Sequence, residues 1–378
     1  MAEITPNPNC TNATDMASKF NITGNCALFD FTIYTVMLGS FCFIGFIGNA
    51  ISFTILWNDK TKNATSFLLR ALAVTDTLVL FFSLPLYSFT PVYPYTHTMK
   101  WYSEAYVELL PYLWPCYLTA YTGTIWLTVL VSLNRYFCVC RPFHSADKCS
   151  LPQARKHVCY VAICAIIYNI PRFFEYEKQV LCVGYNESTV TFGIGEFGNN
   201  FWYRIIYANG MYFVILLGGP LVALMFLNVR LIFALKKRQR RREEMGCTGT
   251  GQNNGMQQDL TFVLIVVICV FTVCQIPTFI DHILWTVIDE KMMICGQWHY
   301  YYTAIGDLLS IFNSSVNFFV YVMTSKKFRD SLIVPCINRG QAFMRLPTGL
   351  AEMTVATQTP NHNVKATTTT ALLATTRQ

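Results

Sequence analysis

Long runs of apolar residues, separated by short polar stretches, dominate the chain from about residue 31 to residue 323. Seven of these runs are long enough for a helix to cross a membrane, which takes about 20 residues. A helix pairs all of its backbone groups internally, whereas an open sheet in lipid would leave many unpaired. The pattern therefore predicts seven transmembrane helices, over residues 31–57, 66–90, 107–138, 156–174, 204–235, 260–287 and 299–323. The third and fifth runs exceed one span, so we expect their ends to project into water.

The polar stretches divide the chain into four parts. Residues 1–30 form a polar tail, and residues 31–325 form the seven-helix domain. Residues 326–340 include the amphipathic stretch KKFRDSLIVPC, which predicts a short eighth helix lying on the membrane. Cys336 at its end is a candidate for palmitoylation, with an unmodified thiol as the alternative. Residues 341–378 are rich in threonine and nearly uncharged, so we expect a disordered cytoplasmic tail.

Composition agrees with this assignment, since 53% of the residues are hydrophobic and only 13% are charged. Soluble domains carry about 25% charged residues. The predicted fold class is therefore an all-α membrane protein, a seven-transmembrane helix bundle with a short amphipathic eighth helix. No nucleophile with a nearby base, metal-ligand spacing or phosphate loop is evident, so we expect neither an enzyme nor a bound cofactor.

Lysine and arginine are distributed unequally between the polar connections. If the N-terminus is extracellular, 22 of the 28 lie on the cytoplasmic side, and the other six are Lys19, Lys100, Arg172, Lys178, Arg204 and Lys291. This asymmetry orients membrane proteins and predicts a multi-pass plasma-membrane protein with its N-terminus outside. The net charge of +7 then reflects orientation and attraction to the lipid bilayer, and we expect no nucleic-acid partner.

The outer side is acidic in this orientation, because it carries 13 of the 21 Asp and Glu residues. It also carries four N-x-S/T sequons, which are candidates for glycosylation. Their asparagines are Asn9, Asn12, Asn21 and Asn186.

Polar residues within the apolar runs are costly in lipid and are functional candidates by default. Four of them, Asn49, Asp76, Asn313 and Asn317, are expected to form one buried network with waters or a sodium ion at Asp76. The alternative is that they only hold helices together, at about 0.6 kcal/mol each. No other metal site is expected. Arg135 lies at the end of the third run, where a guanidinium is also costly.

Several short motifs occur in a fixed order along these runs: GN at 48–49, LAVTD at 72–76, NRY at 134–136, CQIP at 274–277 and NSSVNFFVY at 313–321. Together they resemble the rhodopsin-like family of G-protein-coupled receptors over residues 30–335. Three further stretches resemble the invertebrate FMRFamide-type neuropeptide receptor group: YNIPRFFEYE at 168–177, LNVRLI at 227–232 and SSVNFFVY at 314–321.

The resemblance implies a role for the NRY triplet, Asn134, Arg135 and Tyr136. Arg135 would be the cytoplasmic switch that contacts a heterotrimeric G protein, with Tyr321 joining a water network in the active state. Asn134 stands where the family usually has an acid, and Gln257 lies where the sixth helix usually has one. Arg135 thus lacks its usual ionic restraint, which predicts raised basal activity. A snorkelling interfacial arginine is the alternative.

The resemblance also narrows the range of possible ligand classes. Tyr117 replaces the Asp that binds amines, and no lysine lies between Tyr300 and Thr324 to bind retinal. Gln275 replaces the tryptophan toggle and Phe318 the proline of the seventh-helix motif, so details of the switch differ from the family pattern. An extracellular neuropeptide remains, and an amidated RFamide-like peptide is the leading candidate.

We expect Asp281 and Asp307 to project into an outward-opening cavity and to bind the peptide's arginine through charge-assisted hydrogen bonds. An acidic rim would attract the peptide: Glu104, Glu108, Glu175, Glu177, Asp289 and Glu290. Gln275 is also expected to bind the ligand. Aromatic residues would pack a C-terminal Arg-Phe-amide through stacking and cation–π contact: Tyr112, Trp114, Tyr117, Phe279, Trp285, Tyr301 and Tyr302. The alternative is that the rim acids are solvated and the aromatics form a membrane-interface belt.

Four cysteines lie on the outer side, Cys10, Cys26, Cys182 and Cys295, and they allow three pairings. The family's third-helix cysteine is replaced by Leu110, and Cys116 lies about 9 Å deeper along the helix. We favour Cys26 with Cys295, and Cys182 with either Cys10 or Cys116.

Two alternative functions stay open: a receptor for a different amidated peptide, and a seven-helix transporter. A transporter is disfavoured because the sequence has one mid-membrane carboxylate and no internal repeat.

Overall fold

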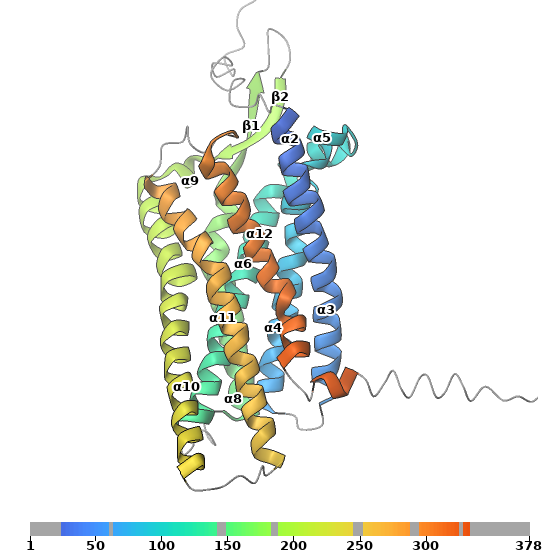
Figure 1. The fold of residues 1–378 in the computed structure, drawn as a ribbon. Coiled ribbons are helices and arrows are strands. Elements are labelled where there is room, and N and C mark those ends of the chain that lie inside the picture. The colour runs from blue at the N-terminus through green and yellow to red at the C-terminus, as the bar shows by residue number, and fades with distance from the viewer. Residues whose placement is uncertain are drawn as a thin grey trace, which may run out of the picture. The chain divides into compact units, whose positions relative to one another are not determined.

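The computed structural model describes residues 24–59, 63–141, 149–182, 188–244, 252–287, 295–324 and 328–332. The chain divides into two units, residues 1–332 and 333–378, and every described residue belongs to the first. In that unit each of the seven apolar runs is a helical span, and the spans lie side by side in a bundle (Figure 1). The predicted seven-helix fold class is therefore confirmed.

The first four spans run from the N-terminus of the bundle. The first joins α2 (Gly24–Asp30), the π-helical η1 (Phe31–Leu38) and α3 (Gly39–Trp57). The second joins α4 (Ala64–Ser83) and the π-helical η2 (Leu84–Ser88), and the third is α6 (Lys100–Cys140). The fourth joins α8 (Leu151–Asn169) and the 3₁₀ helix η3 (Ile170–Phe174).

The last three spans complete the bundle. The fifth joins the π-helical η4 (Tyr203–Met211) and η5 (Phe213–Gly218) to α10 (Gly219–Glu244), the sixth is α11 (Gln252–Val287) and the seventh is α12 (Trp298–Thr324). Short elements lie at one end: α5 (Val92–Thr96), α9 (Glu196–Asn199) and the strands β1 (Tyr176–Cys182) and β2 (Ser188–Ile194). We call this the hairpin end and the opposite end the Arg135 end (Figure 1).

Hydropathy supports membrane crossing. Among the described residues, six helical segments are long and apolar enough to span a membrane, and α11 adds a shorter apolar run, Cys269–Leu284. Several helices are longer than their apolar runs: α6 begins at Lys100 and α11 at Gln252. The predicted projection of the third and fifth spans beyond one membrane thickness agrees with these lengths, since α6 has 41 residues, or about 60 Å.

The predicted eighth helix is described only in part. Residues 328–332 are helical, with Phe328 buried. The Nη1 of Arg329 donates to the carbonyls of Val322 and Met323, at 3.0 and 2.9 Å. It thereby pairs carbonyls that α12 leaves open at its C-terminus. Cys336 and the rest of the predicted stretch lie outside the described residues.

The interior has two apolar clusters with polar side chains between them. One cluster, towards the hairpin end, includes Leu38, Val79 and Ile125. The other, towards the Arg135 end, includes Leu68, Val131 and Tyr321. Along α4, α6 and α12 several residues between the clusters are polar and buried, and they include Asp76, Thr124, Ser314 and Asn317. We call these four, with Asn49, the polar layer.

Two glycines are required by close approaches. A Cβ on Gly48 would lie 2.8 Å from the Cβ of Phe318, so the absence of a side chain lets α3 and α12 pack closely. A Cβ on Gly219 would lie 2.3 Å from the carbonyl oxygen of Val214, five residues earlier. The π-helical turns of the fifth span bring that carbonyl against Gly219, and only glycine fits there.

A disulfide closes the hairpin end. Cys26 of α2 is bonded to Cys295, just before α12, as predicted. The same two elements are joined by an edge-on contact between Phe29 and Tyr301, with ring centroids 4.7 Å apart. Cys116 is a free thiol, so the alternative pairing of Cys182 with Cys116 is wrong; Cys116 is too deep along α6. Cys10 and the side chain of Cys182 lie outside the described residues.

Removing this disulfide should destabilise the protein measurably. We expect Cys26→Ser, Cys295→Ser and the double variant to lose the same amount, on the order of 2 kcal/mol, because all three lose one bond that closes a very long loop. Thermal unfolding in detergent measures the loss, and Cys116→Ser, which replaces a free thiol, should leave the melting temperature nearly unchanged. Additive losses from the two single variants would contradict the bond.

Candidate functional site

Asp307 of α12 lies among tyrosines near the hairpin end. The hydroxyl of Tyr34 donates to Asp307 Oδ2 at 3.2 Å. Tyr34 stacks on Tyr87, with centroids 6.0 Å apart, and Tyr87 meets Tyr117 edge-on at 5.6 Å. Tyr117 stacks on Tyr121 at 5.9 Å. These four rings, which we call the tyrosine row, cross the bundle from η1 through η2 to α6.

Asp307 has no cationic partner in the part of the chain that the structure describes. Its carboxylate is an electrostatic neighbour of Tyr87, Tyr117 and Tyr121, and of Asp281 on the adjacent helix α11. Two neighbouring carboxylates repel each other, and tyrosine faces attract cations. The acidic site, by which we mean Asp281 and Asp307, is therefore suited to a positively charged group.

Asp281 differs from Asp307 in its partners. The hydroxyl of Thr303 donates to Asp281 Oδ1 at 2.7 Å, and Nε2 of His299 lies 3.3 Å from the same oxygen. Both partners are on α12, and His299 is only 1% exposed. His299 was not among the predicted site residues. Its spacing of four from Thr303, which puts both on one helix face, was the available signal.

The other predicted ligand residues are scattered around this site. The Tyr302 hydroxyl donates to the Pro277 carbonyl at 3.1 Å, and Phe279 packs against Phe213 with centroids 5.2 Å apart. Trp285 is on α11, but its side chain lies outside the described residues. Whether any of them contacts a ligand stays a prediction.

Two exposed residues of the predicted acidic rim are paired with lysines of the chain itself. Glu104 lies 3.6 Å from Lys100, and Glu108 accepts a hydrogen bond of 2.5 Å from Lys178. Both pairs are exposed, where such bridges contribute little to stability. Glu177 is exposed, and Asp289 and Glu290 lie outside the described residues.

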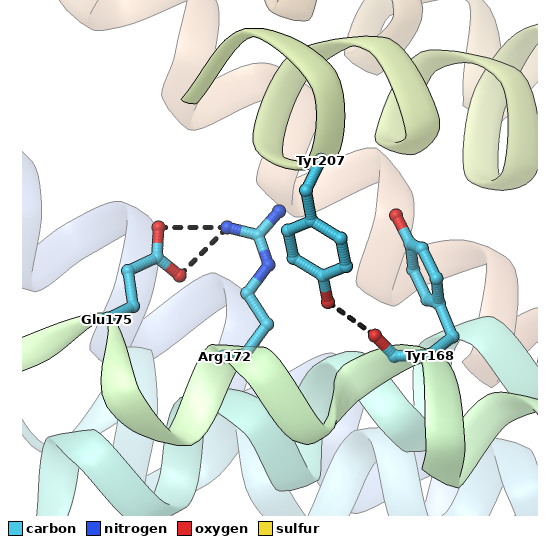
Figure 2. A network of polar contacts seen from close by, with 4 residues as sticks. All are labelled: Tyr168, Arg172, Glu175 and Tyr207. Carbon is cyan, nitrogen blue, oxygen red and sulfur yellow. Dashed lines mark hydrogen bonds and ion pairs between the residues drawn. The ribbon is translucent and has the colours of Figure 1, made fainter. Parts of the chain in front are cut away.

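Glu175 is not a rim residue, and its prediction was wrong. Figure 2 shows it beside Arg172, whose Nη1 donates to both carboxylate oxygens at 2.9 and 2.8 Å. Both residues are buried, at 6% and 9% exposure. The arginine Cζ lies 5.2 Å from the ring centroid of Tyr207, and the Tyr207 hydroxyl donates to the Tyr168 carbonyl. This cluster joins the end of the fourth span to the start of the fifth.

The strand β1 leaves this cluster directly. Burial raises the pKa of Tyr176, its first residue, to about 12, so the phenol stays neutral. The backbone N–H of Gly195 donates to the Glu175 carbonyl at 2.9 Å. Both ends of the hairpin are therefore anchored at the buried ion pair.

The polar layer brings together part of the predicted network. Asn317 Nδ2 donates to Asp76 Oδ2 at 2.7 Å, and Asn49 Nδ2 donates to the Ser314 carbonyl at 3.0 Å. Asp76 is fully buried, and Asn313 is buried about one turn before Asn317. Helices α3, α4 and α12 thus meet through polar atoms.

Arg135 is 5% exposed and forms no ion pair with any carboxylate of the described residues. Its neighbour Asn134 points to α4, where its Nδ2 donates to Thr65 Oγ1 at 3.1 Å. Burial raises the pKa of the Cys149 thiol to about 12, so the thiol stays protonated, and it donates to the Asn134 carbonyl at 3.5 Å. Tyr136 is partly buried, and Tyr321 is buried against Phe328, with ring centroids 5.6 Å apart.

One buried hydrogen bond connects the tyrosine row to the sixth span. The Tyr121 hydroxyl donates to Gln275 Oε1 at 2.8 Å. Both residues are buried, at 4% exposure each. A shift of the row would therefore act directly on α11.

The chain matches the family described as "7 transmembrane receptor (rhodopsin family)" over residues 48–321, and it belongs to this family of signalling receptors, which are not enzymes. It is 27% identical over 344 residues to the FMRFamide receptor of Drosophila melanogaster, covering 89% of this chain and 59% of that protein. The chain thus spans well under two thirds of that relative's length.

Two further relatives are similar. The sex peptide receptor of Drosophila melanogaster is 24% identical over 354 residues, which cover 85% of this chain and 77% of that protein. An FMRFamide peptide receptor of Caenorhabditis elegans is 25% identical over 298 residues, which cover 77% and 66%.

The hydrogen bond between Tyr121 and Gln275 can be tested by a double-mutant cycle. We expect Tyr121→Phe alone to cost about 1–3 kcal/mol, because it leaves Gln275 Oε1 buried without its donor. Tyr121→Phe combined with Gln275→Leu should cost less than the sum of the single variants. Thermal unfolding in detergent gives the coupling, and strictly additive losses would show that the two groups do not interact.

Proposed function

We propose that this receptor binds an extracellular neuropeptide, an amidated peptide with arginine near its C-terminus, and signals to a heterotrimeric G protein. The observation that carries the proposal is Asp307, a carboxylate without a cation among the described residues, set against the tyrosine row. An arginine guanidinium can interact with this site in two ways. It forms charge-assisted hydrogen bonds with a carboxylate, and it stacks on the faces of aromatic rings. Two relatives with FMRFamide in their names support the same peptide class.

Asp281 is proposed as a secondary contact. Thr303 and His299 already bind one of its oxygens, so a ligand cation would gain less there. Asp281 also adds negative charge beside Asp307 and would draw a cation into the acidic site.

Signalling would follow from a shift between two states of the bundle. A ligand shifts the equilibrium only by its differential affinity for the two states. A guanidinium at Asp307 would press on the tyrosine row and, through Tyr121 and Gln275, on α11. Movement of α11 would free Arg135 and its surroundings for a G protein. The extracellular N-terminus and plasma-membrane location belong to this proposal, as does glycosylation of the outer asparagines.

Sodium is proposed as a regulator of the polar layer. Asp76 Oδ1 and Thr124 Oγ1 are buried, and the side chains of Thr124 and Ser314 lie beside the Asp76 carboxylate. These oxygens fit a hard monovalent cation, which would neutralise the Asp76 carboxylate and hold α4, α6 and α12 together.

A second peptide class has support of its own. The similarity to a sex peptide receptor extends over 85% of this chain, so a different peptide ligand is the competing proposal. Its signature would be activation by a peptide without arginine at the position next to the terminal amide.

Asp307→Asn should weaken an Arg-Phe-amide peptide by at least about 30-fold in a displacement assay, because it removes one partner of a desolvated charge pair. Asp281→Asn should weaken it less, and Glu108→Gln, at an exposed lysine pair, should have almost no effect. In the Asp307→Asn variant, replacing the peptide's arginine with citrulline should reduce the affinity little further. Equal losses from citrulline in the variant and the parent would rule out the pairing.

Asn134→Asp should lower basal signalling, because a carboxylate beside Arg135 supplies the restraint that the chain lacks. Ligand-free G-protein activation in cells, normalised to surface expression, measures it. Thr65→Val serves as the control, since it removes the partner of Asn134 without adding charge. An unchanged basal level in Asn134→Asp would show that Arg135 is restrained in another way.

A further inference from the structure

Two arginines lie around one aromatic ring near the Arg135 end. Arg70 of α4 has its Cζ 5.6 Å from the ring centroid of Phe67, and Arg155 of α8 has its Cζ 6.0 Å from the same centroid. Arg70 also lies 5.1 Å from the ring of Trp57, the last residue of α3. Two guanidinium groups therefore lie close to the place where α3, α4 and α8 approach one another.

Neither guanidinium has a counter-ion among the described residues. In the described ranges no carboxylate forms an ion pair with Arg70 or Arg155, although Asp59 lies nearby and accepts a hydrogen bond of 2.8 Å from Ser66. The Nε of Arg70 is buried and has no hydrogen-bond partner in the described part. Stacking on a ring uses the face of a guanidinium and leaves its in-plane N–H donors open to an anion.

The depth of the two arginines matches a lipid head group. Arg70 is six residues into α4, about 9 Å from its start, and Arg155 is four residues into α8, about 6 Å. Long basic side chains at this depth extend towards the membrane surface, and tryptophan is typical of the interface. The distribution of lysine and arginine assigns this end to the cytoplasmic leaflet, which carries anionic lipid.

An apolar surface continues from the arginines into the membrane. On α4, Val74, Leu78 and Phe81 are exposed and follow Arg70 at helical spacing. On the fourth span, Ile163 and Ile166 of α8 and Ile170 of η3 are exposed in the same way beyond Arg155. A free phosphate ion would use only the cations, whereas a phospholipid would use the cations and both apolar faces.

We propose that Arg70 and Arg155 bind the head-group phosphate of one anionic phospholipid in the cytoplasmic leaflet, with its acyl chains along the exposed faces of α4 and α8. The lipid supplies a counter-charge that none of the described residues supplies. It would also hold the second and fourth spans together at the end where Arg135 lies. This site does not involve the acidic site or the peptide.

The test uses the full-length chain in a nonionic detergent, titrated with short-chain phosphatidylserine and followed by native mass spectrometry. Arg70→Gln and Arg155→Gln should each raise the dissociation constant about fivefold, and the double variant about 25-fold, from about 1 kcal/mol per basic residue near a lipid surface. Arg230→Gln is the matched control. Arg230 stacks on Phe226 alone, at 5.9 Å, and its loss should not change binding.

Three results would overturn the proposal. The first is equal affinity in the parent and in Arg155→Gln, which changes an exposed side chain and should fold. The second is equally tight binding of phosphatidylcholine or cholesterol, which would show a neutral lipid site. The third is displacement by inorganic phosphate at matched concentration, which would show a free-anion site. If Arg70→Gln does not fold, Arg70→Lys keeps the charge that attracts an anionic head group and should retain affinity within about threefold.

Discussion

The hydrogen bond between Asn317 and Asp76, 2.7 Å long, lies at the centre of the structure. A carboxylate among apolar helices is costly unless polar groups surround it, so α3, α4, α6 and α12 must stay in register around this position. The polar layer separates two apolar clusters that could otherwise slide past each other, because dispersion alone specifies register weakly. The rest of the bundle is arranged around this constraint: the acidic site on one side and Arg135 on the other.

Two structural connections link the acidic site to the rest of the bundle. Asp307 and Asn317 are ten residues apart on α12, about 15 Å, and the acidic site therefore shares a rigid element with the polar layer. A second route runs across the bundle, since the tyrosine row ends at Tyr121 and its hydroxyl reaches Gln275 of α11. Gln275 places a hydrogen-bonded amide at this point of α11. The contact is directional, so it depends on helix rotation more strongly than a packed ring would.

The sequence was sufficient for the seven spans and for the contact of Asp76 with Asn317, because hydropathy and polarity within an apolar run can be read from the sequence directly. The Cys26–Cys295 bond was also predicted, since few cysteines lie on the outer side. The sequence was insufficient where pairing depends on local backbone geometry. Arg172 meets Glu175 because the 3₁₀ turn of η3 eclipses residues three apart, and apolar periodicity does not report that turn. The hairpin of β1 and β2 was missed because its residues alternate weakly, and the π-helical turns because Gly219 alone signals them.

Unpaired charges of opposite sign lie towards the two ends of the described bundle. Towards the hairpin end, Asp307 lies against tyrosines and has no cationic partner among the described residues. Towards the Arg135 end, Arg135, Arg70 and Arg155 have no carboxylate partner among those residues. Arg135 is buried and Asp307 and Arg70 are half-buried, whereas Arg155 is exposed. A buried or half-buried charge without a partner is unstable unless something outside the chain supplies one. Elsewhere the protein satisfies its own charges well, as the bidentate contact of Arg172 with Glu175 shows. Under the two proposals made above, these exceptions are the positions where other molecules supply the opposite charge: a ligand cation at Asp307, and a lipid anion at Arg70 and Arg155.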